Sequence, residues 1–153
     1  IEFITAWDER LAIGDAKVTT KSVPHTGATN GYRIEIDGYV IVYASDHQEP
    51  LHDPGHVDDG VLELCEGADL VIHDAQFTRE ELHARPDWGH CTPTYAVEVA
   101  AQAGAKRLCL FHHDPWHDDD MVDELLEECT EHANDRGVDD VIAAAEGMTL
   151  TFD

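Results

Sequence analysis

The order of the apolar segments is the feature that most restricts how this chain can fold. Residues 2–7 and 16–23 alternate apolar and polar side chains, and residues 32–36 and 39–45 flank Asp37-Gly38, a dipeptide typical of a tight hairpin turn. In the second half, short apolar strands alternate with amphipathic helices. Strands first and strand–helix units afterwards predict an α/β fold in which helices cover a sheet.

The second half also carries start and stop signals for three helices. Asp58, Thr92 and Asp118 suit helix N-caps, and proline follows Thr92 at the first helical position. The predicted elements are a helix ending at Gly67, a strand over 69–74, a helix from Pro93 to Gly104, a strand over 107–111, a helix ending before Gly137, and strands over 141–144 and 148–152. No repeat or linker interrupts this pattern, so residues 1–153 are predicted to form a single domain.

The charge balance and the cysteines restrict the class of protein. There are 33 acidic residues against nine Lys and Arg, which gives a formal net charge of −24. Such a field repels nucleic acid, so any RNA contact would have to be local or metal-mediated; an acidic surface adapted to high salt is the simpler explanation. No apolar stretch approaches the ~20 residues of a membrane span. The four cysteines show no CxxC spacing, which predicts reduced thiols in a cytoplasmic protein.

Three polar residues share a position at or just after the end of a predicted strand. His25 follows "TTKSVP", Asp46 follows "VIVYAS" and His112 follows "RLCLF". Polar groups at the ends of several strands often meet in a cleft at one sheet edge, and an aspartate with two histidines is a plausible ligand set for zinc, manganese or iron. Each residue could instead be a hydrogen-bonded strand end, and spacing alone leaves both interpretations open.

Two further groups suggest proton transfer. Asp74 ends "LVIHD", and His90 in "WGHCT" lies just before a predicted helix start. A histidine that a carboxylate orients can act as a general acid in ester cleavage, which makes Asp74 its candidate partner. The alternatives are packing of His90 against Trp88 and a turn-capping role for Asp74.

These residues carry a resemblance to a known family. "PHTGATNGYRIEIDGYVIVYASDH", "LVIHDAQFT", "WGHCT" and "LCLFHHDP" resemble, in order and spacing, motifs of metallo-β-lactamase-fold hydrolases, especially tRNase Z and cyclic-nucleotide or cyclic-phosphate phosphodiesterases. The resemblance implies an αββα sandwich with two divalent metal ions, most often zinc. It also implies that His25 binds one metal, Asp46 bridges both and His112 binds the second. His90 would protonate the leaving group, and Asp74 would orient it.

The chain departs from the family pattern in two places. The HxHxDH motif, which supplies most metal ligands from the N-terminal half of the sandwich, is absent. The chain therefore resembles the C-terminal half alone, and we expect either a missing N-terminal segment or a second chain to complete it; a homodimer is the family-based expectation. Cys91 replaces the usual serine after His90, which puts that hydrogen bond in doubt; we expect a small, inert residue rather than a reactive thiol.

The resemblance therefore implies a dinuclear metal phosphodiesterase acting on a cyclic nucleotide, a cyclic phosphate or an RNA 3′ end. Because no basic patch is visible, the acidic surface favours small phosphodiesters over tRNA. A thioester or lactone hydrolase and a non-catalytic structural partner are the alternatives. Within "FHHDPWHDDD", we expect His112 to be the ligand, His113 to point away, and Asp118, Asp119 and Asp120 to cap a helix.

Overall fold

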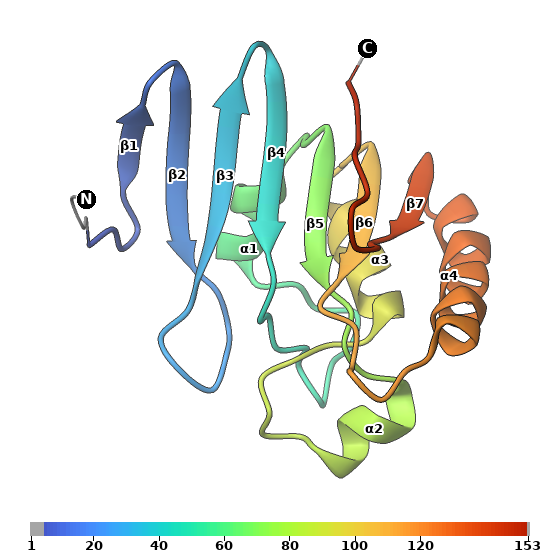
Figure 1. Cartoon of the computed structure of the whole chain (residues 1–153). Helices are drawn as coiled ribbons and strands as arrows, with labels where there is room; N and C mark the ends of the chain where they lie inside the picture. Colours follow the sequence, from blue (N-terminus) through green and yellow to red (C-terminus); the bar gives the residue numbers. More distant parts are fainter. Residues whose placement is uncertain (1–4, 153) are drawn as a thin grey trace.

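The computed structural model describes residues 5–152, which contain one seven-stranded sheet whose strands lie side by side in chain order (Figure 1). The strands β1 to β4 pair antiparallel, and β4 to β7 pair parallel. Their bounds are β1 Arg10–Ile13, β2 Ala16–Ser22, β3 Asn30–Ile36, β4 Tyr39–Ala44, β5 Leu70–Asp74, β6 Arg107–Phe111 and β7 Asp140–Ala143. The predicted α/β class is confirmed.

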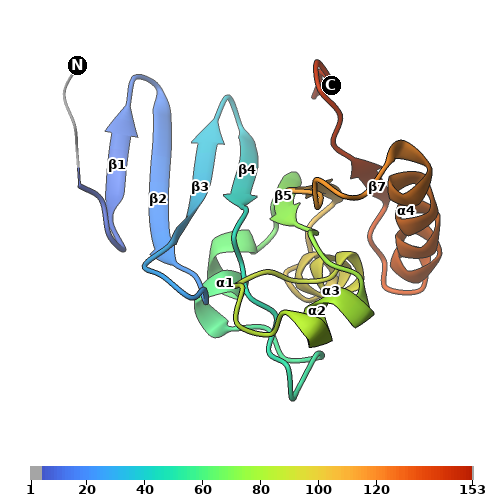
Figure 2. The same cartoon turned by 60° about the horizontal axis from the view of Figure 1, so that its bottom comes forward.

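Helices cover one face of this sheet, apart from one short helix, α2 (Arg79–Ala84), which lies beyond the ends of the strands (Figures 1 and 2). The bounds of the covering helices are α1 Asp59–Cys65, α3 Pro93–Gln102 and α4 Asp119–Asn134. The three predicted N-caps are confirmed, since the side chains of Asp58, Thr92 and Asp118 each accept a hydrogen bond from a first-turn backbone N–H. Among residues 5–152, none of these helices is long and apolar enough to cross a membrane.

The buried core lies between the sheet and the helices. Val42, Val71 and Leu108 are register neighbours on β4, β5 and β6, and each is fully buried. Tyr95 and Val99 of α3 belong to the same cluster. Because parallel strands are buried under helices, β5 is apolar until its last two residues, His73 and Asp74, and β6 is apolar after its first residue, Arg107.

The opposite face of the sheet is apolar but only partly covered. Tyr32 and Ile36 of β3 are 40% and 37% exposed. The last described residues cross in front of this face (Figure 1), and the Phe152 ring packs on Tyr39 at 4.9 Å. A half-sandwich without its second layer is expected to show such a face.

Three sequence predictions differ from the structure. The strand predicted over 2–7 lies partly outside the described residues, and residues 5–7 form no strand; the first strand is β1, which turns at Gly14 to meet β2. Residues 148–152 form no strand, because they cross the sheet face instead of extending the ladder. Helix α2 was not predicted, although its capping box, Thr78 with Glu81, is legible in the sequence.

Candidate functional site

The strands β2 and β4 to β7 run in the same direction, so their carboxyl ends lie along the same edge of the sheet (Figure 1). Parallel pairing aligns Ala44 with His73 and Asp74 with Phe111, so β4, β5 and β6 end level with one another. Strand β2 runs in the same direction, because two antiparallel pairings separate it from β4. The loops that follow these strands therefore open at a common edge, as the sequence predicts.

Asp46, His90 and His112 converge at this edge. Each offers one donor atom, and these three atoms lie within 4.8 Å of one another. The closest approach between His112 Nε2 and Asp46 Oδ1 is 3.7 Å, and Ser45 Oγ donates to the other carboxylate oxygen of Asp46 at 2.6 Å. The group mixes one carboxylate with two imidazoles, a donor set that suits zinc, manganese or iron.

Asp46 and His112 both have a left-handed backbone, with φ of 45° and 61°. Residues with a Cβ rarely adopt this conformation, which costs of order 1 to 3 kcal/mol unless the surrounding structure enforces it. Here the chain leaves β4 and β6 in sharp turns that aim both side chains at one point. Asp8 and Asp37 also have positive φ, at 51° and 53°, but Asp46 and His112 are the two that lie at the edge where the polar groups meet.

His25 lies beside this group but not within it. Its ring centroid is 5.6 Å from that of His90, and its Nδ1 donates to the carbonyl oxygen of Gly89 at 2.7 Å. Because the carbonyl can only accept, the proton is on Nδ1, and Nε2 retains its lone pair. The structure therefore places His25 at the same edge in a tautomer able to bind a metal, although its donor atoms fall outside the set of three.

Gly89 is a site residue that sequence reasoning missed. Its φ is +91°, and a Cβ at this position would lie 2.1 Å from His25 Nδ1. Only glycine allows both the backbone conformation and this close approach. The signal was present in "WGHCT", where a glycine precedes the candidate proton donor.

The predicted contact between His90 and Asp74 is present. His90 Nδ1 lies 2.7 Å from Asp74 Oδ2, and the Asp74 side chain is fully buried. Its Oδ1 accepts from the backbone N–H groups of Gln76 at 3.1 Å and Cys91 at 3.2 Å. Three donors converge on one carboxylate, which holds the Asp74 side chain in place and fixes the proton of His90 on Nδ1.

Cys91 is an inert part of this arrangement, as predicted. Its thiol is buried and donates to the carbonyl oxygen of Asp74 at 3.0 Å. Burial raises the pKa of the Cys91 thiol well above its ordinary value, and the charge of Asp74 raises it further. The sulfur thus provides a hydrogen bond at the position where the resemblance leads us to expect a serine.

A buried pair of histidines lies behind the edge, and sequence reasoning did not find it. His73 Nδ1 donates to the Asp74 carbonyl at 2.8 Å, so its Nε2 accepts from His47 Nδ1, also at 2.8 Å. Burial lowers the pKa of both imidazoles, and the mutual proximity of the two rings lowers that of His47 further. Both are therefore neutral and bring no positive charge to the edge behind Asp46.

The residues of the charged segment 111–120 have different roles, largely as predicted. Asp118 caps α4, accepting from the Met121 N–H at 3.0 Å. Asp114 is buried and holds its own loop, since it accepts from the Trp116 N–H at 2.9 Å and lies 3.6 Å from the Arg85 guanidinium. Of this segment, His112 is the member that joins the candidate metal-binding group.

Comparison with known proteins gives a consistent result. The family model described as "Beta-lactamase superfamily domain" matches residues 3–113. The Ribonuclease Z of Anoxybacillus flavithermus is 42% identical over 67 residues, which are 44% of this chain and 22% of that protein. The Ribonuclease Z of Trichodesmium erythraeum is 37% identical over 73 residues, 46% of this chain and 23% of that protein.

Solved structures show the same fold at lower identity. The metallo-beta-lactamase fold protein YhfI from Bacillus subtilis superposes with a TM-score of 0.68 at 21% identity, covering 92% of this chain and 52% of that one. The short form of human tRNase Z gives a TM-score of 0.65 at 21% identity, covering 92% of this chain and 45% of its own. The chain thus spans about half the length of these two structures, and its match to the curated relatives spans less than a quarter of theirs.

Proposed function

Because this chain belongs to the beta-lactamase superfamily domain family, we propose that it carries part of the active site of a metal-dependent phosphodiesterase that cleaves RNA. The observation that carries the proposal is the buried hydrogen bond of 2.7 Å between His90 and Asp74, next to Asp46 and His112. The Ribonuclease Z relatives favour an RNA phosphodiester over the cyclic nucleotides and cyclic phosphates that the motifs alone leave open.

We propose His25, Asp46 and His112 as the ligands that this chain contributes to two divalent ions. Two observations support this assignment. Asp46 and His112 belong to the convergent group at the sheet edge. His25 lies beside that group, with its ring centroid 5.6 Å from that of His90, and its Nδ1–H is engaged by the Gly89 carbonyl, which leaves Nε2 available. Zinc suits such donors well, and manganese or iron also accept them. Divalent ions, when bound, supply Lewis-acid polarisation of the phosphate and a water that ionises near neutral pH.

His90 is proposed as the proton donor to the leaving oxygen. Asp74 accepts the Nδ1–H of His90, and the backbone N–H groups of Gln76 and Cys91 hold its carboxylate in place, so the imidazole is kept in one orientation towards the leaving oxygen. Nε2 of His90 has no hydrogen-bond partner within residues 5–152, so it is the ring nitrogen that can meet a substrate. Asp74 acts through His90 and is a positioning residue.

The ligand set of this chain is incomplete for two ions. Each ion needs about four donors, and His25, Asp46 and His112 cannot supply them all. The partly exposed apolar sheet face around Tyr32 and Ile36 likewise calls for a covering layer. We propose that a further segment or a second chain provides both, and the homodimer expected from the resemblance is one form of this arrangement.

The decisive experiment is His90→Ala in the completed enzyme. We expect turnover of an RNA phosphodiester to fall about 10²- to 10⁴-fold, the usual contribution of a general acid, while metal content measured by atomic emission stays unchanged. His83→Ala is the matched control, because His83 is exposed on α2. Loss of metal in His90→Ala would make His90 a ligand and overturn the proton-donor assignment.

A second measurement tests the incomplete ligand set. The purified chain alone should bind zinc weakly in a calorimetric titration and show little phosphodiesterase activity. Tight binding of two ions per chain with full turnover would contradict the proposed need for a completing layer.

A further inference from the structure

Folding gathers basic side chains that are scattered in the sequence. A groove of about 560 Å³ is lined by Arg10 of β1, Lys17 and Lys21 of β2, and Arg33 of β3. These are four of the nine Lys and Arg residues in a chain of formal net charge −24. The sequence shows no basic patch because these residues are up to 23 positions apart and alternate with neutral and acidic ones.

Strand pairing explains how the four side chains reach one surface. Thr19 lies opposite Arg10 on one side and Arg33 on the other, and Lys17 lies opposite Glu35. Paired residues of antiparallel strands point to the same face, so these side chains share the face on which α1 packs. The Arg33 guanidinium confirms this placement, since it donates to the backbone carbonyls of Leu64 and Glu66 at the end of α1.

The charges within the groove are unevenly neutralised. Lys21 pairs with Glu63 of α1, and Arg33 lies 3.3 Å from Glu35. Arg10 and Lys17 are exposed, and neither has an acidic partner within ion-pair distance among residues 5–152. Glu66 is the third carboxylate that lines the groove. The groove therefore holds four cations against three carboxylates.

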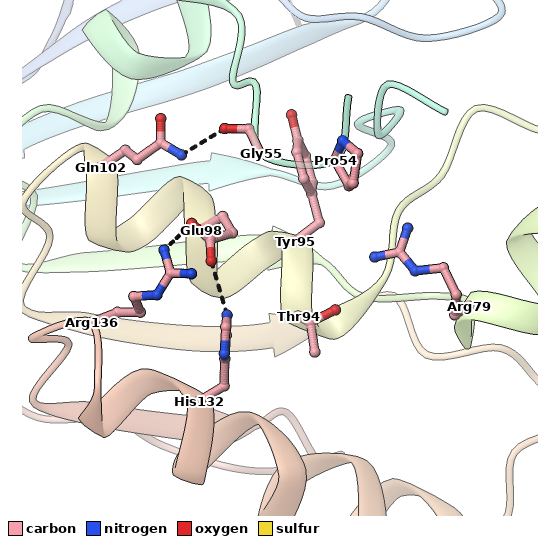
Figure 3. Close-up of a pocket in the computed structure, with 9 residues that line it drawn as sticks. All are labelled: Pro54, Gly55, Arg79, Thr94, Tyr95, Glu98, Gln102, His132 and Arg136. Atoms are coloured by element: carbon pink, nitrogen blue, oxygen red, sulfur yellow. Dashed lines mark hydrogen bonds and ion pairs between the residues drawn. The ribbon is translucent and has the colours of Figure 1, made fainter. Parts of the chain in front are cut away.

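The other basic side chains of the described region are each engaged by an acid. Arg79 pairs with Glu49, Arg85 with Glu81 and Asp114, Lys106 with Asp69, Arg107 with Asp140, and Arg136 with Glu98. Figure 3 shows one such case, a pocket where Glu98 takes hydrogen bonds from both Arg136 and His132. In contrast to that pocket, the groove retains cations that are free to meet an external anion.

We propose that this groove binds the phosphodiester backbone of single-stranded RNA outside the cleavage site. Arg10 and Lys17 are diagonal neighbours across the β1–β2 ladder, so their Cα atoms are about 7–8 Å apart. Consecutive phosphates of an extended strand can match this spacing. The Thr19 hydroxyl lies between Arg10 and Arg33 as a further donor. Strand β2 then leads directly from Lys21 towards His25, so a bound strand can continue to the candidate site.

The inference depends on the proposed function for the choice of RNA as ligand, whereas the groove itself is tested by binding alone. The probe is a short, fluorescently labelled single-stranded oligoribonucleotide, titrated with the full chain in EDTA and followed by anisotropy at several salt concentrations. Arg10→Gln with Lys17→Gln should weaken binding about tenfold at low salt and make the slope of log K against log salt shallower by about 1.4, because two phosphate contacts are lost.

The matched control removes the same charge elsewhere. Lys106→Gln with Arg107→Gln changes two paired cations beyond the groove and should alter affinity less than about twofold and leave the slope unchanged. Arg10→Lys with Lys17→Arg keeps both charges and should retain binding. Equal weakening by the two glutamine pairs would overturn the proposal, as would a wild-type chain that does not bind the oligonucleotide at low salt.

Two further outcomes separate this proposal from the others. If polyglutamate displaces the oligonucleotide as well as unlabelled RNA does, the groove takes acidic polypeptides and the RNA assignment is wrong. Hydrolysis of bis(p-nitrophenyl) phosphate by the completed enzyme tests the catalytic proposal separately, because this small diester does not need the groove. If the glutamine variants of Arg10 and Lys17 neither weaken RNA binding nor change this hydrolysis, the groove proposal is refuted and the catalytic proposal is not.

Discussion

The parallel and antiparallel parts of the sheet present polar groups in different ways. On β4, β5 and β6 the interior is apolar, and the polar groups are concentrated at or beyond the carboxyl ends, where Asp46, Asp74 and His112 lie. On β1, β2 and β3 they lie along a solvated face, where Lys17 and Arg33 line the groove. The side chains at the edge are held by contacts from several elements at once, whereas the side chains of the groove are placed by strand register alone. Activity at the edge should therefore be sensitive to the loss of a single atom, and binding in the groove should weaken stepwise as charges are removed.

The largest expected effect tests the edge through Asp74→Asn. The amide would present a donor to His90 and favour the wrong tautomer, so turnover of the completed enzyme should fall by up to about 10⁴-fold with metal content unchanged. Cys91→Ser is the matched control, since a hydroxyl keeps the hydrogen bond to the Asp74 carbonyl. If Asp74→Asn were as active as wild type, the edge would be no more sensitive to a single-atom change than the groove, and the comparison would be wrong.

Two glycines sharpen the comparison: Gly89 lies in the loop that borders the edge, and Gly31 lies in β3 of the antiparallel part. Gly89→Ala should cost more than about 2 kcal/mol in unfolding free energy and also weaken metal binding, because the methyl group would displace His25. Gly31→Ala should cost about 1–3 kcal/mol by overpacking, since its Cβ would lie 2.4 Å from Leu64 Cδ2, and metal binding should not change.

The control for these variants is Gly104→Ala. Gly104 has φ of +65° but no atom within 4 Å of the added Cβ, so it isolates the backbone cost, about 1 kcal/mol. Denaturant unfolding and zinc titration together check all three. Equal metal affinity in Gly89→Ala and Gly31→Ala would remove the distinction between the two regions.

The pH dependence of stability provides a smaller test behind the edge. Burial lowers the pKa of His73 in the folded state, so the unfolded chain binds more protons as the pH falls through about 6.5. The contribution of neutral His73 to the unfolding free energy is therefore complete above that pH. Below it, the unfolding free energy falls by up to about 1.4 kcal/mol per pH unit. His73→Asn should flatten this dependence in urea unfolding between pH 7 and 5, and an unchanged profile would contradict the assignment.

The smallest expected effect concerns the groove. Arg33→Gln removes two hydrogen bonds to the carbonyl end of α1, which should cost about 1 kcal/mol of stability because the site is partly solvated. Arg107→Gln, which loses an exposed ion pair on β6, should cost less than that. Thermal unfolding checks the order, and a larger loss in Arg107→Gln would reverse it.

How much the sequence could predict differs between the two regions. Asp37-Gly38, the three N-caps and the strand-end positions of Asp46 and His112 were legible, because turns, caps and apolar runs are local signals. The HxHxDH departure and the order of motifs predicted the half-sandwich. These signals were sufficient for the fold and for most of the edge.

Contacts that depend on register or on backbone approach could not be predicted. The hydrogen bond from His25 to the Gly89 carbonyl joins residues 64 positions apart in the sequence, and the His47–His73 hydrogen bond joins residues 26 positions apart. The groove requires the pairing of Arg10 with Thr19 and of Thr19 with Arg33, which no local pattern encodes. The strand predicted over 148–152 was wrong for a related reason, since the apolar residues of this segment pack on the sheet face instead of pairing with its edge.

The left-handed backbone at Asp46 and His112 has a consequence for how this protein can change over generations. At both positions glycine would relieve the backbone strain and so favour the folded state, while removing a side chain proposed to bind metal. Under the proposed function, selection for catalysis must therefore oppose a gain in stability at both residues. A descendant released from that selection should lose these two side chains early, and glycine at 46 and 112 in an otherwise intact fold would mark a copy that has abandoned catalysis.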